Sequence, residues 1–143
     1  MNQCTICKRL DLLKSAGDTA MIYEFPHSYL LLGNHQYFPG YCVLYYKQHV
    51  RELHELSPEI QAALSKELMQ ATTAIVRAFN PWKMNHACLG NRDQHIHWHI
   101  MPRYESEADH QMHPWTHADE FDSCLISPEQ QREAIELIRF HLQ

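Results

Sequence analysis

A short stretch of the chain, QHIHWHIMPRY at residues 94–104, alternates histidine with large apolar residues. Side chains two residues apart on an extended strand point to the same side, so the alternation predicts a strand with one core face and one face of imidazoles. The histidines are His95, His97 and His99, and the apolar residues are Ile96, Trp98 and Ile100. Because a buried imidazole without a partner is costly, the row is expected to line a pocket whose ligand or metal supplies partners.

The flanking sequence predicts further strands that pair with this one. Apolar runs separated by Pro26 occupy residues 18–25 and 28–34, and a longer run follows the turn at residues 39–40. Another apolar segment, residues 83–90, is joined to the histidine strand by the polar residues NRDQ, a connection short enough for a hairpin. The histidine strand is therefore expected to be paired and internal.

Two segments carry the signals of helix starts. Ser57 followed by Pro58 combines a capping hydroxyl with the imino acid best tolerated at the first helical position. Apolar residues then recur with helical spacing for about five turns, up to Phe79. Near the end of the chain, Ser127 with Gln130 three residues later predicts a capping box that opens a second helix.

Together these elements predict an α+β fold, an antiparallel sheet with a long central helix and a C-terminal helix. One domain is expected over residues 1–143, with its core over about 4–104. Residues 4–15 are expected to form a short helix or turn. Residues 105–143 are expected to be an extension that begins with a polar excursion at 105–126 and ends in the second helix.

The composition excludes several classes of partner. Of the 143 residues, 45% are hydrophobic, and no apolar run is long enough to cross a bilayer, so we expect one globular domain and no membrane partner. The formal net charge of -5 and the absence of any lysine or arginine cluster argue against a nucleic-acid partner. The first ten residues, MNQCTICKRL, lack the apolar core of a secretory signal, so a cytoplasmic protein is expected.

The amino-terminal motif CTIC places Cys4 and Cys7 at the spacing of half a tetrahedral zinc site, and histidines can provide the other half. A redox pair is the alternative, although no strand leads into the motif as it does in thioredoxin-like proteins. Two unrelated thiols are a third interpretation. Because the chain has five cysteines, an odd number, thiols or metal thiolates in a reducing compartment are favoured over a disulfide framework.

The histidines elsewhere in the chain are interpreted as surface residues or as core residues with ordinary partners. Near pH 7 a neutral imidazole can act as nucleophile, general base or general acid, and it can bind zinc, but the pattern that suggests such chemistry is the strict alternation of three. This interpretation covers eight of the nine histidines outside that pattern, all except His49, and the eight are His27, His35, His54, His86, His110, His113, His117 and His141.

The stretch QHIHWHIMPRY resembles the signature of the histidine-triad family, nucleotide-binding hydrolases and transferases in which such a triad, followed by apolar residues, ends a core strand. PGYCVLYYKQHVRELHELSPE, at residues 39–59, resembles that family's strand, its lysine-x-histidine turn and the start of its central helix, and CTIC resembles the zinc-binding members. These motifs cover most of residues 4–104 in the family's order. The part beyond residue 104 is variable in such proteins.

The resemblance implies nucleophilic catalysis by the triad. His97, the middle histidine, would attack the α-phosphorus of a nucleotide and become a nucleotidyl-histidine. Attack requires the other ring nitrogen to carry the proton and to be held, by a backbone carbonyl near His95 or by a neighbouring side chain. His99 could donate to the phosphate oxygens or to the leaving group. The predicted catalytic set is therefore His95, His97 and His99.

The resemblance also implies one structural zinc ion per chain and no organic cofactor. In zinc-containing relatives the ligands are the two cysteines, the histidine of the lysine-x-histidine turn and the first triad histidine. Here these are Cys4, Cys7, His49 and His95. Four protein ligands close the shell, so the metal would fix the amino-terminal segment against the catalytic strand without touching substrate.

Three residues are predicted to contact the nucleotide. Family members usually carry Asp or Asn at the end of the second strand, against the ribose hydroxyls. At the matching distance before Pro39 this chain has Gly33, with Asn34 one step along, so Asn34 can serve if the loop is one residue shorter. Asn91, on the turn into the triad strand, is a candidate for a phosphate contact, and Gln94 is a weaker one. A turn or surface role is the alternative for both.

The resulting functional hypothesis is a hydrolase that acts at the α-phosphate of a dinucleoside polyphosphate or a nucleoside phosphoramidate. Members of the family form dimers, so a homodimer is expected. A nucleotidyltransferase is the alternative enzyme, favoured if a second substrate outcompetes water for the intermediate. An alternative from another functional class is a non-catalytic nucleotide sensor or a zinc-stabilised binding module. The intact histidine row argues against it, because binding alone needs no nucleophile.

Overall fold

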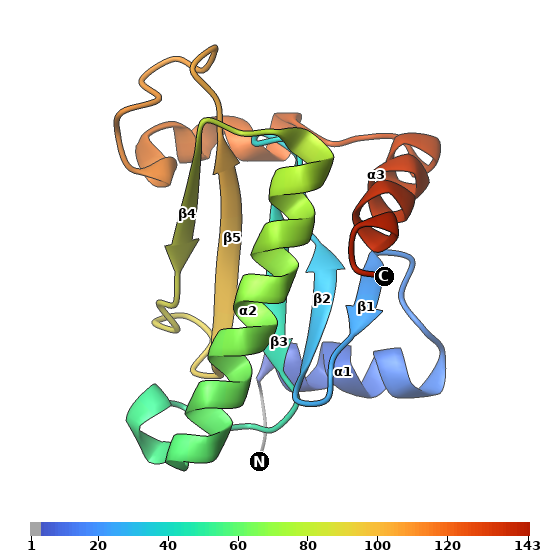
Figure 1. The fold of residues 1–143 in the computed structure, drawn as a ribbon, viewed down its shortest axis with the longest axis vertical. Coiled ribbons are helices and arrows are strands. Elements are labelled where there is room, and N and C mark those ends of the chain that lie inside the picture. The colour runs from blue at the N-terminus through green and yellow to red at the C-terminus, as the bar shows by residue number, and fades with distance from the viewer. Residues whose placement is uncertain (1–3) are drawn as a thin grey trace.

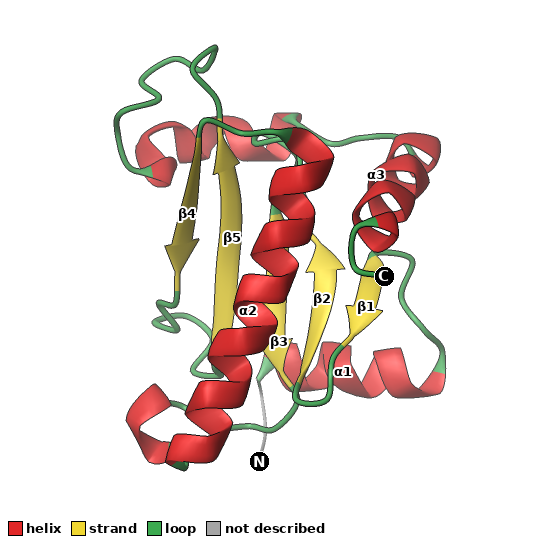
Figure 2. Cartoon of the chain, viewed as in Figure 1, coloured by secondary structure: helices red, strands yellow, loops and turns green. Residues whose placement is uncertain are grey.

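The computed structural model describes residues 4–143 as a five-stranded sheet with helices on both of its faces (Figure 1, Figure 2). Residues 1–3 lie outside the described part. They belong to the domain expected over residues 1–143 and to the amino-terminal segment in which no secretory signal was expected. No helix within residues 4–143 combines the length and the apolar character needed to cross a bilayer. The elements in chain order are α1 (Thr5–Ser15), β1 (Met21–Glu24), β2 (Ser28–Leu32), β3 (Cys42–Tyr46), a 3-10 turn (Leu53–Glu55), α2 (Pro58–Phe79), β4 (Lys83–Ala87), β5 (His97–Arg103), a 3-10 segment (Pro114–Ser123) and α3 (Pro128–Phe140).

The strands form one antiparallel sheet in the order β1-β2-β3-β5-β4. The strand β5, which carries two of the three triad histidines, lies between β3 and β4, so the prediction of a paired and internal strand is confirmed. In the register of β3 and β5, Tyr45 lies opposite His97 and Val43 lies opposite His99. Because opposite residues share a face of a sheet, these four side chains lie on the same face.

The two faces of the sheet are covered differently. The helices α2 and α3 lie over one face, and α1 crosses the other (Figure 1). On the α2 side, Ile75 belongs to a buried cluster that includes Trp98 and Ile100 of β5, so the apolar row of the alternation faces the larger core as predicted. On the α1 side, Ile6 and Val43 belong to a smaller cluster. The predicted α+β arrangement with a long central helix and a C-terminal helix is confirmed.

Both predicted helix starts are present. The Ser57 hydroxyl accepts a hydrogen bond from the backbone N–H of Ile60 at 3.4 Å, and Pro58 follows as the first residue of α2. In α3, the side chain of Gln130 accepts from the backbone of Ser127 at 2.9 Å, and the hydroxyl of Ser127 accepts in return from the backbone of Gln130 at 3.1 Å. These reciprocal bonds form the expected capping box.

Candidate active site

The histidine face of β5 forms the floor of a pocket of about 560 Å³. The helix α1 forms one wall, the loop between β4 and β5 forms another, and the segment after β5 forms a third. Parts of the chain that are far apart in sequence therefore meet over the histidines. The lining includes Ile6, Arg9, Val43, His97, His99 and Trp115.

The His97 side chain is held in a defined orientation at the start of β5. Its Nδ1 lies 2.6 Å from the backbone carbonyl oxygen of His95, and the residue is only 9% exposed. A carbonyl oxygen can only accept, so Nδ1 carries the ring proton and Nε2 keeps a lone pair. The expected backbone carbonyl near His95 is therefore present, and the His97 ring is oriented as a nucleophile requires.

The His99 ring contacts a tyrosine. Its Nδ1 lies 2.7 Å from the hydroxyl oxygen of Tyr41, which precedes β3. Burial lowers the pKa of His99 to about 4, and the nearby charges of His97 and His35 add to this effect. His99 is therefore neutral at pH 7.

The first triad histidine faces a different site. The chain at His95 has not yet entered β5, and its side chain lies among Cys4, Cys7 and His49 rather than in the pocket. Its Nε2 donates to the backbone carbonyl of Tyr46 at 2.7 Å. The predicted catalytic set is thus divided, with His97 and His99 in the pocket and His95 connected to it through its backbone carbonyl.

Four side chains beside the pocket fit a tetrahedral zinc site. One ligand atom from each of Cys4, Cys7, His49 and His95 lies within 4.8 Å of the other three. The Cys7 sulfur is 3.3 Å from Nδ1 of His49 and 3.4 Å from Nδ1 of His95, and the Cys4 sulfur is 3.7 Å from the latter. A tetrahedron with the usual zinc bond lengths has sulfur to nitrogen edges of about 3.6 Å. The carbonyl of Tyr46 holds the proton of His95 on Nε2, which leaves the Nδ1 lone pair for a metal.

The predicted nucleotide-binding residues are not all in the pocket. Asn34 and Asn91 line it, whereas Gln94 does not. The neighbouring Gly33 has no room for a side chain, because a Cβ there would lie 2.2 Å from the ring of Tyr41. Asn34, the next residue, lines the pocket, and its contact with a ribose stays a prediction.

The histidines predicted to be surface or core residues are outside the lining of this pocket. Nδ1 of His27 is 2.9 Å from a carboxylate oxygen of the buried Glu67, and Nε2 of His86 is 2.8 Å from the hydroxyl of Thr72. His35 stacks on Phe121 with ring centroids 4.2 Å apart. These are the ordinary partners expected of structural histidines, and none of the eight lines the pocket as the structure describes it over residues 4–143.

A sequence model of the HIT domain matches residues 14–106, which is more than half of the chain. This chain belongs to the HIT domain family. The HIT family comprises nucleotide-binding proteins and includes nucleotide hydrolases, among them the diadenosine triphosphate hydrolase of Plasmodium falciparum.

Two curated relatives of this HIT protein are similar over most of its length. "Adenylylsulfatase HINT3" of Arabidopsis thaliana is 28% identical over 112 residues, which are 75% of this chain and 55% of that protein. "Protein hit" of Bacillus subtilis is 31% identical over 132 residues, which are 82% of this chain and 83% of that protein. The chain thus spans about half the length of the Arabidopsis protein and most of the length of the Bacillus one.

Solved HIT structures have the same fold. A histidine triad protein from Sinorhizobium meliloti has a TM-score of 0.77 and 22% identity, with 97% of each chain covered. A zinc-bound family protein from Mycobacterium smegmatis has a TM-score of 0.68 and 20% identity, covering 98% of this chain and 93% of that one. The Plasmodium falciparum hydrolase has a TM-score of 0.60 and 21% identity, covering 86% and 76%.

Arg9, Tyr41 and Trp115 are among the pocket residues that were not predicted from the sequence. Arg9 follows Thr5 by four positions, so it shares a face of α1 with it, a spacing that the predicted helix could have revealed. Tyr41 stands before β3, where nothing in the local pattern singles it out. Trp115 belongs to the polar excursion beyond the family match, and its contact with His99, with ring centroids 5.9 Å apart, has no local signal.

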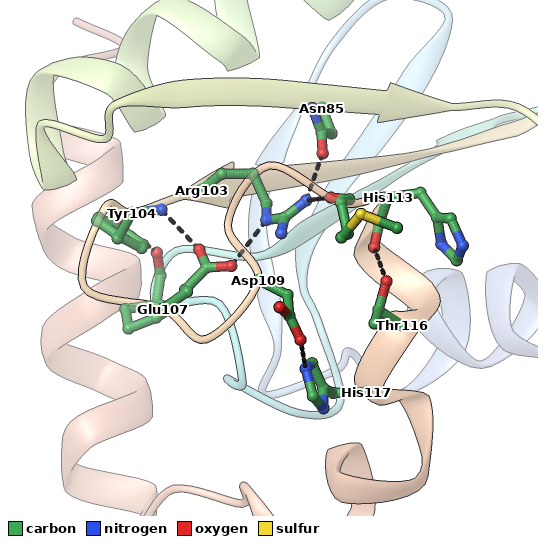
Figure 3. A network of polar contacts seen from close by, with 10 residues as sticks. Asn85, Arg103, Tyr104, Glu107, Asp109, His113, Thr116 and His117 are labelled. Carbon is green, nitrogen blue, oxygen red and sulfur yellow. Dashed lines mark hydrogen bonds and ion pairs between the residues drawn. The ribbon is translucent and has the colours of Figure 1, made fainter.

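A polar network folds the excursion back onto the sheet (Figure 3). The guanidinium of Arg103, at the end of β5, donates to Glu107 at 2.9 Å, to Asn85 at 2.8 Å and to the carbonyl of Met112 at 2.7 Å. The other carboxylate oxygen of Glu107 accepts from the backbone of Tyr104 at 2.6 Å. Arg103 is only 3% exposed, so this network is part of the protein interior. The predicted excursion at residues 105–126 is therefore anchored, and it contains the 3-10 segment that carries Trp115.

Proposed function

We propose that this HIT protein is a nucleotide hydrolase that cleaves at the α-phosphate of a dinucleoside polyphosphate or a nucleoside phosphoramidate. The observation that carries the proposal is the 2.6 Å contact between Nδ1 of His97 and the carbonyl oxygen of His95. It leaves a nucleophilic Nε2 on a histidine that lines a pocket of about 560 Å³, large enough for a nucleotide. Family membership supports the nucleotide, and the oriented imidazole supports covalent catalysis.

The reaction has two displacements at phosphorus. The lone pair on Nε2 of His97 attacks the α-phosphorus, and the bond to the leaving group breaks, so that a nucleotidyl-histidine forms. A phosphate leaves as an anion, whereas an amine takes up a proton from solvent as it leaves. The positive charge that develops on the ring is stabilised because its Nδ1–H already donates to the His95 carbonyl. Water then attacks the same phosphorus, gives up a proton to solvent and releases the nucleoside monophosphate, which restores the free imidazole.

The remaining pocket residues have roles in holding the nucleotide. Asn34 is proposed to contact the ribose hydroxyls and Asn91 a phosphate oxygen, since both line the pocket. Gln94 stays a weaker prediction, because it is outside the lining. Ile6 and Val43 are apolar surfaces on which a base can pack.

A structural zinc ion, one per chain, is proposed at Cys4, Cys7, His49 and His95, supported by their mutual distances and by the zinc-bound Mycobacterium smegmatis relative. When bound, the ion would supply a rigid cross-link and no Lewis acid chemistry, since four protein ligands close its shell. One residue, His95, connects this cluster to the nucleophile. His95 would be fixed on its Nδ1 side by the cluster and on its Nε2 side by Tyr46, and its backbone carbonyl orients His97.

The test is product analysis with three adenylyl substrates that differ in leaving group. Adenosine phosphoramidate and diadenosine tetraphosphate represent the two proposed classes, and adenylyl sulfate is added because the Arabidopsis relative is named an adenylylsulfatase. Wild-type protein should release AMP from at least one of them. His97→Ala should lose turnover by several powers of ten, because it removes the nucleophile and leaves the apolar face of β5 intact.

The matched control is His86→Ala, which removes an imidazole from β4 outside the pocket and should keep wild-type turnover. Near-normal turnover by a folded His97→Ala variant would contradict the assignment of His97 as the nucleophile. Transfer of AMP to an added acceptor in preference to water would favour the nucleotidyltransferase, and tight nucleotide binding without turnover would favour a sensor. Homodimer formation and a cytoplasmic location stay predictions.

A further inference from the structure

The histidines of the row have hydrogen-bond partners of different kinds. Nδ1 of His97 faces a backbone carbonyl, which can only accept. Nδ1 of His99 faces the hydroxyl of Tyr41 at 2.7 Å, and a hydroxyl can either donate or accept. The tautomer of His99, and hence the group that it presents to substrate, depends on which of the two directions this bond takes.

The burial and the chemistry of the pair assign the donor to Tyr41. The separation of 2.7 Å establishes a hydrogen bond but not its direction, because the imidazole N–H groups of His95 and His97 donate over 2.7 and 2.6 Å. Tyr41 is also only 5% exposed, and burial raises the pKa of its phenol, so the hydroxyl keeps its proton. A neutral phenol is a good donor, and the imidazole lone pair is a better acceptor than a phenol oxygen.

The Tyr41 ring is itself held in place on both sides. His35 lies against it with ring centroids 4.7 Å apart, and His35 in turn stacks on Phe121. On another side the Tyr41 ring packs so closely against Gly33 that a Cβ at this glycine would lie 2.2 Å away. A side chain packed in this way has little freedom to move its hydroxyl away from His99.

We propose that Tyr41 is a positioning residue that holds His99 in the tautomer with the proton on Nε2, so that His99 gives the pocket a neutral N–H donor beside the nucleophile. The inference rests on the proposed function and deepens it. The adjacent histidines of the pocket then have opposite tautomers. His97 presents a lone pair for attack, and His99 presents a proton for a phosphate oxygen of the substrate.

This arrangement decides between the two roles that the sequence leaves open for His99. A neutral imidazole that has one N–H can donate a hydrogen bond, but giving up that proton would create an imidazolate, so it is a poor general acid. The groups facing the ring are Tyr41, His97, Trp115 and, behind Tyr41, His35, none of which is a carboxylate that would favour a charged ring. We therefore expect His99 to hold the phosphate oxygens.

The first test is ¹⁵N NMR of the histidine rings in substrate-free protein. The His99 signals, assigned by their loss in His99→Gln, should show an unprotonated Nδ1 and a protonated Nε2 at pH 7. In Tyr41→Phe, which keeps the ring and removes only the hydroxyl, the two tautomers should exchange and the His99 signals should move toward averaged values. A purely structural role of Tyr41 would leave the tautomer unchanged.

The second test is kinetic. Tyr41→Phe should lower kcat on the order of tenfold with KM changed less than about twofold, because the lost bond orients a donor that acts mainly in the transition state. Its control is Tyr29→Phe, the same hydroxyl deletion at a tyrosine that is 7% exposed and outside the pocket lining, which should keep wild-type kcat. Plots of log rate against leaving-group pKa for wild type and His99→Ala should be parallel.

A protonated Nδ1 on His99 in the wild type would overturn the proposal, and so would a Tyr41→Phe variant with an unchanged tautomer. A steeper dependence of log rate on leaving-group pKa in His99→Ala than in wild type would show instead that His99 acts as a general acid. The NMR test needs no turnover, so its outcome stands even if none of the nucleotides is hydrolysed, and the two proposals can fail separately.

Discussion

Two of the pocket walls come from opposite ends of the described chain, and they are anchored in different ways. The amino-terminal wall, α1, is held to the sheet at its first turn by the cluster of Cys4, Cys7, His49 and His95. The carboxy-terminal wall, residues 105–123, is held at its start by the buried network around Arg103. Farther along, Phe121 of the same wall stacks on His35 with ring centroids 4.2 Å apart.

This difference explains why the anchor of one wall could be predicted from the sequence and the anchor of the other could not. A metal-type anchor requires particular residue types with particular spacing, so CTIC suggested half of a zinc site, and the family resemblance added His49 and His95. A buried arginine can be satisfied by many acceptors, and here one of the three is a backbone carbonyl, that of Met112. Such a network has no sequence motif, although it anchors the segment that carries Trp115.

The largest effect should follow from breaking the amino-terminal anchor. Cys4→Ser combined with Cys7→Ser should lose the zinc and lower the apparent free energy of unfolding by about 5 kcal/mol, less than in a domain that folds only with its metal, because the sheet keeps its own core. Elemental analysis and thermal unfolding measure both, and amide exchange should quicken in α1. Turnover should fall less than in His97→Ala.

The control is Cys88→Ser, which removes an exposed cysteine outside the cluster. Freshly reduced wild type, purified without chelators and devoid of zinc, would contradict the zinc site. A reversible disulfide between Cys4 and Cys7 would point instead to the redox pair.

A smaller effect is expected at the carboxy-terminal anchor. Arg103→Met keeps much of the buried side-chain volume but leaves the carboxylate of Glu107 without its cation, which should cost about 3 kcal/mol in urea unfolding. Amide exchange should quicken in residues 105–123 and stay slow in α1. Glu24→Gln, which breaks an exposed ion pair with Lys47, should change stability little. Equal exchange in both walls would mean that the two anchors are one cooperative unit.

The smallest effect on stability should come from truncating the side chain of Trp115 in the carboxy-terminal wall. Trp115→Ala should change stability at pH 7 by less than about 1 kcal/mol, since the residue is 37% exposed. It also uncovers His99, whose pKa burial holds at about 4, so the pKa should rise toward 6.5. NMR titration of the ring measures this directly. Trp82→Ala, at an exposed tryptophan away from the pocket, should leave it unchanged.

The sign of the accompanying stability change follows from proton binding. Between pH 6.5 and pH 4 the unfolded chain binds a proton at His99 that the folded chain does not, so acidification through this window destabilises the fold. Allowing for partial exposure, wild type should lose about 2 kcal/mol from this group. Trp115→Ala should lose less over the same window. An equal loss in both proteins would show that Trp115 does not contribute to the burial of His99.

Much of the fold was predictable because its signals are local. The cap at Ser57, the capping box at Ser127 and Gln130, and the period-two alternation in β5 each depend on residues within one element, and each is present. The strand boundaries were less predictable. His95 matches the alternation, yet β5 begins only at His97, because the backbone N–H groups of His95 and Ile96 bond the carbonyls of Asp93 and Val50 outside the strand ladder.

The sequence by itself indicated which chemical groups the site contains, since the alternating histidines predict a pocket, CTIC fits half of a zinc site, and the family resemblance adds His49. Only the tertiary structure decided what each imidazole can do. His95, His97 and His99 look equivalent in the pattern, but their rings bond the carbonyl of Tyr46, the carbonyl of His95 and the hydroxyl of Tyr41. The tautomer of a histidine follows from such partners. The carbonyl of His95 is local to His97 and was expected, whereas Tyr46 and Tyr41 come from a distant part of the chain and cannot be identified from the local sequence.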